Sequence, residues 1–191
     1  MKILVLVYEG FAEFEMTLLG YVAREERNEV VTAAPDDTPQ VRGMGGLLAT
    51  ADLRLSQVNV AEYAALVIPG GTPESLIDRE EVSALIRRFH DAGKLVVAIC
   101  MGPVHLAKAG VLAGRAFTTS SSQNYRDLFD WPRKVDNPVV VDGNIITAQG
   151  EAFVNFTFTV MERLEAYQDM ADAPRWRREF GAWQDGVVSK D

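Results

Sequence analysis

Cysteine and histidine are scarce in this sequence. Its 191 residues include one cysteine, Cys100, and two histidines, His90 and His105. A single cysteine cannot form an internal disulfide, which agrees with a reducing compartment and predicts a cytoplasmic protein. The two histidines lie in separate segments without a ligand-like spacing to Cys100, so we expect no metal site. The sequence thus leaves one free thiol to be explained.

The sequence also has no excess of positive charge and no long apolar run. Lys and Arg total 19 against 27 Asp and Glu, and the net charge of -8 repels nucleic-acid phosphates and anionic lipids. No apolar run reaches the roughly 18 residues of a membrane span, and the first residues carry no signal-peptide cleavage pattern. No Walker pattern is present, and "GMGG" at 43–46 lacks the spacing of a dinucleotide loop. We therefore expect no cofactor, no nucleic-acid partner and no membrane association.

Short apolar runs do alternate with helical periodicity, and the 48% hydrophobic fraction is typical of a globular domain. The predicted strands are 2–8, 28–35, 64–71 and 94–100; the predicted helices are 15–26, one that ends near 90–94, and 153–167; the predicted hairpins are 47–58 and 137–150. Strands that are apolar on both faces and separated by helices indicate an α/β fold, with a largely parallel sheet covered on both sides. Such sheets bind ligands at the carboxyl ends of their strands.

The cysteine stands at one of these strand ends. In "AICMG" the small residues Ala98 and Gly102 flank Cys100 at the spacing of a sharp strand-to-helix turn, the nucleophile elbow. This turn places a thiol at a helix N-terminus, where free amides and the helix dipole favour the thiolate. The alternative is that Cys100 is a buried filler at the end of a core strand.

Two further strand ends carry polar or glycine-rich sequence. In "PGGTPESL", the backbone amides of Gly70 and Gly71 could bind an oxyanion, although two glycines can equally make a simple tight turn. In "GFAEFEMTLLG", Glu13 and the preceding Glu9 are explained by the favourable dipole at a helix start. Glu15 lies among apolar residues, where a carboxyl with a raised pKa could act as an acid, a base or a donor to a thiolate.

The segments "GFAEFEMT", "VIPGG" and "AICMGP", in this order, resemble the ThiJ/PfpI superfamily, the group of the parkinsonism-associated deglycase and the class I glutamine amidotransferase-like proteins. The resemblance extends over about 2–167 and implies a flavodoxin-like three-layer α/β/α sandwich with a mainly parallel central sheet. It also implies a homodimer. The site residues that it implies are Cys100 as nucleophile, Glu15 as its carboxyl partner, and Gly70, Gly71 and Met101 as backbone oxyanion donors.

One departure from the family pattern concerns histidine. Enzymatic members carry a histidine directly after the cysteine or after a later strand, and here these positions correspond to Met101 and about Ser120. The hydroxyls of Ser120, Ser121 or Tyr125 could orient a substrate or a water molecule. His105 falls more than one turn into the next helix, so we expect it to be packed or exposed rather than catalytic. We expect His90 to lie at the surface.

Two functions follow from these residues. The first is a cysteine-dependent hydrolase or lyase that acts on a small carbonyl or amide compound, with Cys100 as nucleophile and Glu15 as proton carrier. The alternative is a non-catalytic oxidative-stress sensor or chaperone-like protein, in which Cys100 is oxidised and Glu15 binds the product. The missing histidine favours the alternative, and the family resemblance favours the enzyme.

The composition changes near residue 169. We predict one domain over 1–168 and a C-terminal helical extension over 169–191, in which Trp176, Phe180 and Trp183 recur at helical spacing. The extension is expected to pack on this domain or on a dimer mate.

Overall fold

The computed structural model describes residues 1–121 and 123–181. The helices are α1 (Phe14–Glu25), α2 (Glu80–Asp91), α3 (Pro103–Lys108), α4 (Phe153–Arg163) and α5 (Ala173–Gly181). The strands are β1 (Lys2–Leu6), β2 (Glu29–Ala34), β3 (Gln40–Arg42), β4 (Leu48–Thr50), β5 (Leu53–Arg54), β6 (Ala65–Ile68), β7 (Leu95–Ile99), β8 (Val139–Asp142) and β9 (Ile145–Ala148). Each predicted core strand is present, with ends that differ by a few residues.

One mainly parallel sheet of seven strands forms the centre of the molecule, in the order β5-β2-β1-β6-β7-β9-β8. Only β8 runs antiparallel to its neighbour. The chain goes from β1 outward to β2 and later returns to the other side of β1 as β6, so the strand order reverses at β1 and β6. A sheet of this kind opens a crevice at such a reversal, beside the carboxyl ends of the strands.

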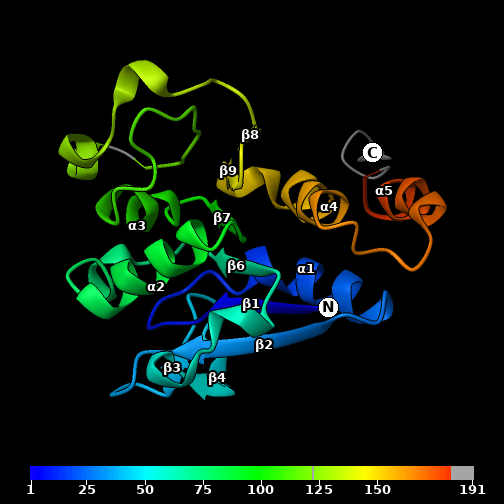
Figure 1. Cartoon of the computed structure of the whole chain (residues 1–191), viewed down its shortest axis with the longest axis horizontal. Coiled ribbons are helices and arrows are strands. Elements are labelled where there is room, and N and C mark those ends of the chain that lie inside the picture. Colours follow the sequence, from blue (N-terminus) through cyan, green and yellow to red (C-terminus); the bar gives the residue numbers. More distant parts are fainter. Residues whose placement is uncertain (122, 182–191) are drawn as a thin grey trace, which may run out of the picture.

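Helices cover both faces of the sheet, as the three-layer prediction requires (Figure 1). α1 packs against α4, and α2 packs against α3. Every residue of β6 and β7 is buried. These strands read as continuous apolar runs because both of their faces contact helices. The predicted α/β sandwich is therefore confirmed.

The predicted hairpin at 47–58 is wrong in its pairing. β4 pairs antiparallel with the earlier strand β3, and Leu53 and Arg54 instead join the main sheet in parallel to β2. The side chain of Asp52 explains the change of direction, because its Oδ2 accepts hydrogen bonds from the Thr32 amide at 2.8 Å and hydroxyl at 2.7 Å. The chain that follows is thereby held against β2.

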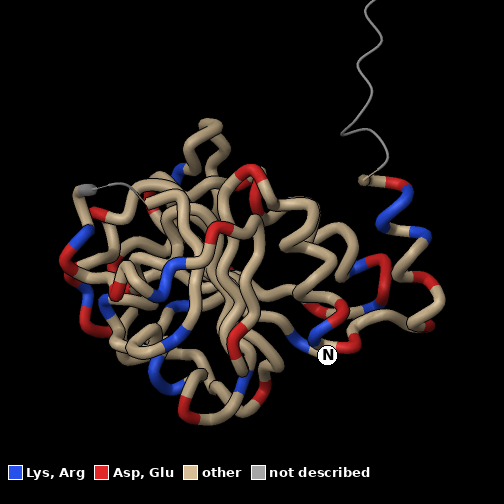
Figure 2. The backbone as a smooth tube through the Cα atoms, turned by 90° about the horizontal axis from the view of Figure 1, so that it is seen from above, with Lys and Arg blue, Asp and Glu red and all other residues tan. Residues whose placement is uncertain are grey.

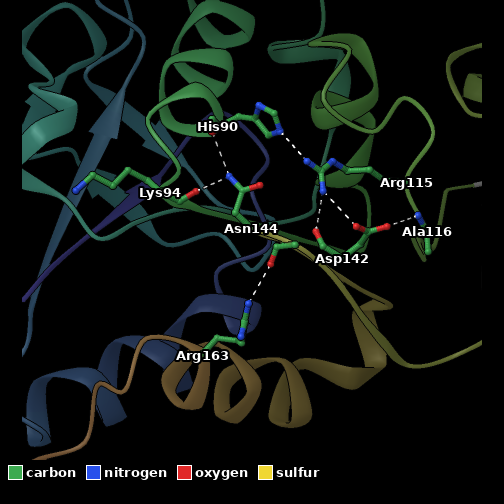
Figure 3. Close-up of polar contacts among 8 residues, drawn as sticks. His90, Lys94, Arg115, Ala116, Asp142, Asn144 and Arg163 are labelled. Atoms are coloured by element: carbon green, nitrogen blue, oxygen red, sulfur yellow. Dashed lines mark hydrogen bonds and ion pairs between the residues drawn. The ribbon is translucent and has the colours of Figure 1, made fainter.

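The predicted hairpin at 137–150 is present as β8 and β9. Gly143 in its turn has φ +61°, a conformation that glycine adopts without strain. The turn lies at the amino-terminal edge of the sheet, where Arg115 donates to both the carbonyl and a carboxylate oxygen of Asp142, and Asn144 donates to the carbonyls of His90 and Lys94 (Figure 3). We call these contacts the amino-edge clamp.

The described part of the C-terminal extension packs on its own domain. Trp176 of α5 is buried, its ring meets Tyr21 of α1 edge-on at 5.8 Å, and its indole N–H donates to the buried carboxylate of Glu26. The other Glu26 oxygen accepts from the Gln168 amide at 2.9 Å. Trp183, predicted to belong to the same helix, lies outside the described residues.

Basic and acidic positions are interspersed along the described part of the chain (Figure 2). Lys and Arg positions alternate with Asp and Glu along the loops and helices (Figure 2). No helix among residues 1–121 and 123–181 is long and apolar enough to cross a membrane.

Candidate active site

Cys100 forms a strained elbow directly after β7. Its φ of +61° lies in the left-handed region, which costs a non-glycine residue about 1 kcal/mol or more. Three hydrogen bonds hold it there: the Cys100 amide donates to the Ala148 carbonyl at 2.8 Å, and the Cys100 carbonyl accepts from the Thr119 hydroxyl at 2.8 Å and the Ser120 amide at 3.0 Å. The predicted elbow is thus present in the backbone.

The helix after the elbow gives less support to a thiolate than the sequence predicts. α3 has six residues, and its first, Pro103, has no N–H. The neighbouring amides of Gly102 and Val104 donate to the carbonyls of Ile99 and Met101. Among the described residues, the Met101 amide is the one backbone group that lowers the pKa of the Cys100 thiol. The expected stabilisation by free amides at a helix start is therefore reduced to one donor.

Glu15 lies beside Cys100, brought there by the first turn of α1. Its side chain is fully buried, and Oε2 accepts a hydrogen bond from the Gly70 amide at 2.6 Å. Burial raises the pKa of the carboxyl, although the Gly70 hydrogen bond opposes this rise. Oε1 is buried without a hydrogen-bond partner among the described residues. Glu15 is thus the perturbed carboxyl that its apolar sequence context predicts.

Two glycines enclose this pair. A Cβ on Gly70 would lie 2.6 Å from the Cys100 Cβ and 2.9 Å from Glu15 Oε2. A Cβ on Gly150 would lie 3.0 Å from the Cys100 sulfur and 3.2 Å from Glu15 Oε1. Any side chain at either position would therefore displace the thiol or the carboxyl.

The carboxyl disfavours ionisation of the thiol, whereas the hydrogen bond from the thiol lowers the pKa of the carboxyl. Burial, together with the nearby Glu15, raises the pKa of Cys100 to about 12. At neutral pH the Cys100 thiol therefore keeps its proton. It is therefore not a free thiolate, and the Glu15 carboxyl lies beside it.

Of the three predicted substrate-contacting residues, Ser120 lies at the sulfur. The residue is exposed, its hydroxyl accepts a hydrogen bond from the Gly150 amide at 2.9 Å, and its hydrogen bond with the Cys100 side chain lowers the pKa of the thiol. Ser121 is buried, and its amide donates to the Thr119 hydroxyl at 3.0 Å. The Tyr125 hydroxyl donates to the carboxylate of Glu74.

The three predicted backbone oxyanion donors differ in what their amides contact. The Gly70 amide already donates to Glu15 and so supports the carboxyl. The Met101 amide is directed at the Cys100 sulfur. Gly71 has φ +129° and pairs with Phe11 in an isolated antiparallel bridge. No hydrogen bond of its amide is found among the described residues.

His105 is packed beneath the site. It is buried, and its ring meets Tyr8 edge-on at 5.9 Å, while burial lowers the pKa of the imidazole to about 4. The Tyr8 hydroxyl donates to the carbonyls of Pro69 and Gly70. His105 is therefore neutral at neutral pH, and it is packed, one of the two placements expected for it.

The remaining candidates belong to other parts of the fold. His90 is half-buried, accepts from Arg115 at 3.2 Å, and belongs to the amino-edge clamp (Figure 3). Glu9 accepts from the Arg42 amide, and Glu13 accepts from the Leu47 amide. These two carboxylates anchor the β3–β4 hairpin, a role beyond the helix-dipole explanation.

Sequence reasoning missed Gly150, Tyr8 and Thr119 as residues around the elbow. Gly150 could have been found from its position in the sequence, because it follows a buried strand at the same edge of the sheet as Gly70. Tyr8 gave a weaker signal of the same kind after β1. No cluster of three or more metal-ligating side chains is found within the described part of the chain.

Comparison with known proteins agrees with this geometry. The model of the DJ-1/PfpI family matches residues 1–163. Deglycase TK1284 of Thermococcus kodakarensis is 35% identical over 155 residues, covering 78% of this chain and 90% of the relative. Deglycase PH1704 of Pyrococcus horikoshii is 34% identical over 150 residues with the same coverage.

Among solved structures, the DJ-1 superfamily protein Atu0886 from Agrobacterium tumefaciens superposes with a TM-score of 0.80 at 29% identity, covering 94% of this chain and 98% of that one. The sequence motifs, the sheet order and these matches agree with one another. The chain belongs to the DJ-1/PfpI family, within the class I glutamine amidotransferase-like superfamily.

Proposed function

We propose that this protein is a cysteine-dependent hydrolase or lyase that acts on a small carbonyl or amide compound. The observation that carries the proposal is the placement of the Cys100 thiol beside the buried Glu15 carboxyl, whose Oε1 has no hydrogen-bond partner among the described residues. A structural cysteine needs no buried carboxyl beside it, and burial of such a group is costly. The deglycase names of two relatives support the same class of chemistry.

The mechanism begins with attack by sulfur. The Cys100 sulfur forms a bond to the carbonyl carbon while its proton passes to Glu15, and the carbonyl π electrons move to oxygen. Because Glu15 has a raised pKa, it accepts this proton and can return it to the oxygen or to a leaving amine in the next step. One carboxyl therefore serves as base and then as acid.

The developing oxyanion needs hydrogen-bond donors. The Met101 amide and the Ser120 hydroxyl already contact the sulfur, so both lie within reach of an atom bonded to it. The Gly71 amide follows the same strand end and is not paired with another described group. Gly70 contributes indirectly, since its amide holds Glu15 in place. These donors supply the polarisation that the absent family histidine cannot.

The alternative function, oxidative-stress sensing, uses the same contact. A peroxide oxygen would be transferred to the Cys100 sulfur with cleavage of the O–O bond, which gives a sulfenic acid and water. Glu15 would then hydrogen-bond the oxidised sulfur. The neutral, buried His105 takes no part in either reaction.

Turnover of methylglyoxal by the wild type and two variants separates these functions. Cys100→Ser should abolish turnover, and Glu15→Gln should lower it by roughly 10²- to 10⁴-fold, the usual contribution of general acid–base catalysis. Glu25→Gln, an exposed glutamate on the same helix, is the matched control and should retain full activity. Activity that survives in Cys100→Ser would contradict the enzyme proposal. Absence of turnover, combined with peroxide oxidation of Cys100 that depends on Glu15, would favour the sensor.

We propose a homodimer as well. Four apolar side chains that lie at the start of α1 and on the β3–β4 hairpin are 53 to 63% exposed: Phe14, Met44, Leu47 and Leu48. The hairpin is held beside α1 by the Met44 amide, which donates to the Phe11 carbonyl at 2.8 Å. A second copy that covers these side chains would remove them from water. Sedimentation analysis should give twice the mass of one chain for the wild type and a reduced association for Leu48→Lys.

A further inference from the structure

We infer that Thr119 is a positioning residue that aims the Met101 amide at the Cys100 sulfur. The inference rests on the proposed role of Cys100 as nucleophile. It concerns the segment 116–121, called the strap here, which runs beside β9 after α3. Within the described part of the chain, the Thr119 hydroxyl bonds the Cys100 carbonyl and the Ser121 amide and not the sulfur or Glu15, so its influence has to pass through the backbone of the elbow.

The strap is held at three points. At its start, the Ala116 amide donates to the Asp142 carboxylate at 2.9 Å, as part of the amino-edge clamp (Figure 3). In its middle, the Thr118 amide donates to the Thr147 hydroxyl at 2.9 Å. At its end, the Gly150 amide donates to the Ser120 hydroxyl. Thr119 therefore lies on a segment whose path is fixed on both sides.

Thr119 is buried, and its hydroxyl is used twice. It donates to the Cys100 carbonyl at 2.8 Å and accepts from the Ser121 amide at 3.0 Å. The Ser120 amide adds a second donor to the same Cys100 carbonyl at 3.0 Å. Two donors thus fix the orientation of one carbonyl, in a residue whose φ of +61° is unfavourable.

That carbonyl belongs to the same peptide unit as the Met101 N–H. Because a peptide is planar and trans, its C=O and N–H point in opposite directions and rotate together. Holding the Cys100 oxygen toward Thr119 therefore turns the Met101 N–H to the other side, from which this amide lowers the pKa of the thiol. The Thr119 hydroxyl sets the direction of the one backbone donor that the thiol receives.

The direction of the Met101 N–H affects how easily the Cys100 thiol ionises. A hydrogen bond donated to a thiolate favours the charged form and lowers the thiol pKa. Without the Thr119 hydroxyl, the Cys100 carbonyl keeps one hydrogen-bond donor, the Ser120 amide. The peptide is then held less firmly, so the Met101 N–H points at the sulfur less often. The thiol then becomes harder to ionise, and the same amide polarises a bound carbonyl less.

The test compares Thr119→Val, which keeps the shape but removes the hydroxyl, with Thr119→Ser, which keeps the hydroxyl. Thr119→Ala also removes the hydroxyl and leaves a smaller side chain, and we expect the same result from it. Thr157→Val is the matched control, because Thr157 is a buried threonine whose hydroxyl has no hydrogen-bond partner among the described residues. The readouts are methylglyoxal turnover and the pH profile of iodoacetamide reaction with Cys100.

Thr119→Val should lower turnover about tenfold and shift the alkylation profile to higher pH, as expected for one lost hydrogen bond. Thr119→Ser and Thr157→Val should keep the wild-type profile. A purely structural role predicts the opposite sign, since a loosened strap exposes the sulfur and speeds alkylation. Faster alkylation, or an unchanged profile in both Thr119→Val and Thr119→Ala, overturns the inference.

Failure of the proposed function gives a different pattern. If the wild type turns over no substrate while Thr119→Val still shifts the alkylation profile and Thr119→Ser does not, the positioning role stands without the enzyme. Equal loss in Thr119→Val and Thr157→Val contradicts the positioning role, because the control loses no hydrogen bond.

Discussion

The two edges of the central sheet differ in how fully their polar groups are paired. At the carboxyl edge, Cys100 has an unfavourable φ, and Glu15 is buried with one carboxyl oxygen unpartnered among the described residues. At the amino edge, Arg115, Asp142 and Asn144 join the β8–β9 turn to neighbouring segments through hydrogen bonds, and those of Arg115 involve a charged donor (Figure 3). The same sheet thus bears strain at one edge and is fastened at the other.

This difference separates reactivity from stability. Strained backbone and unpaired buried charge persist only where the surrounding structure imposes them, and they commonly mark functional sites. The amino-edge groups are half-exposed, so each contributes little alone and their number matters. Substitutions at the carboxyl edge should therefore affect chemistry most, and those at the amino edge should affect stability alone.

The largest effect is expected at Gly70. Gly70→Ala places a methyl group 2.6 Å from the Cys100 Cβ, which forces the thiol and Glu15 apart. We expect turnover to fall roughly a hundredfold, the usual result of a displacement near 1 Å, and the free energy of unfolding to fall by about 1–3 kcal/mol. Activity assays and urea denaturation measure both quantities.

Gly20→Ala is the control for this substitution. Gly20 lies within α1, and an added Cβ there meets no atom within 4 Å. Alanine should raise the free energy of unfolding by up to about 1 kcal/mol through helix propensity and should leave turnover unchanged. Equal activity of the two variants would show that the enclosure of the thiol by Gly70 does not matter.

An intermediate effect is expected from Glu15→Gln on the pH dependence of stability. The pKa of Glu15 is raised in the folded state, so its contribution is fully present below the unfolded value of about 4.3 and is lost as pH rises through the folded value. The wild type should therefore lose stability relative to Glu15→Gln as pH rises from about 4 toward neutrality. Urea denaturation across this range measures the difference between the two proteins.

Glu25→Gln, at an exposed position on the same helix, controls for the loss of one formal charge. A difference between wild type and Glu15→Gln that grows in the wild type's favour with rising pH would have the wrong sign for a buried carboxyl. It would indicate that Glu15 is stabilised as a carboxylate.

The smallest effect is expected at the amino edge. Asp142→Asn weakens the contacts with Arg115 and the Ala116 amide, and should cost about 1 kcal/mol of stability. The pH profile of Cys100 alkylation should stay unchanged, because the Thr118–Thr147 hydrogen bond holds the strap between the clamp and the elbow. Asp91→Asn, at a more exposed carboxylate, should change stability by less than about 0.5 kcal/mol. A shifted alkylation profile in Asp142→Asn would mean that the two edges are coupled.

Residues at strand ends could be predicted from the sequence, because parallel strands bring their carboxyl ends together. This principle alone gathered Glu15, Gly70 and Cys100 from segments far apart in the chain. The hairpin at 40–50 could not be predicted in the same way, since its partner depends on where the Asp52 side chain binds Thr32.

The pKa of the thiol could also not be predicted from the sequence. The elbow pattern predicts a helix start at the sulfur, but the number of amides left free there depends on Pro103 and on how Gly102 is paired. The raised pKa comes from burial and from Glu15, a residue of a distant segment, and no local pattern records either. For the same reason Thr119 was missed: its contact with the Cys100 carbonyl joins an irregular segment to a turn.

The single cysteine has a consequence for recovery after oxidation. With one cysteine among 191 residues, the chain has no resolving thiol with which a sulfenic acid at Cys100 could condense internally. Its reduction must then come from a separate molecule, and that reductant has to reach a sulfur enclosed by Gly70 and Gly150. The lifetime of the oxidised protein is therefore set by the size and abundance of external thiols.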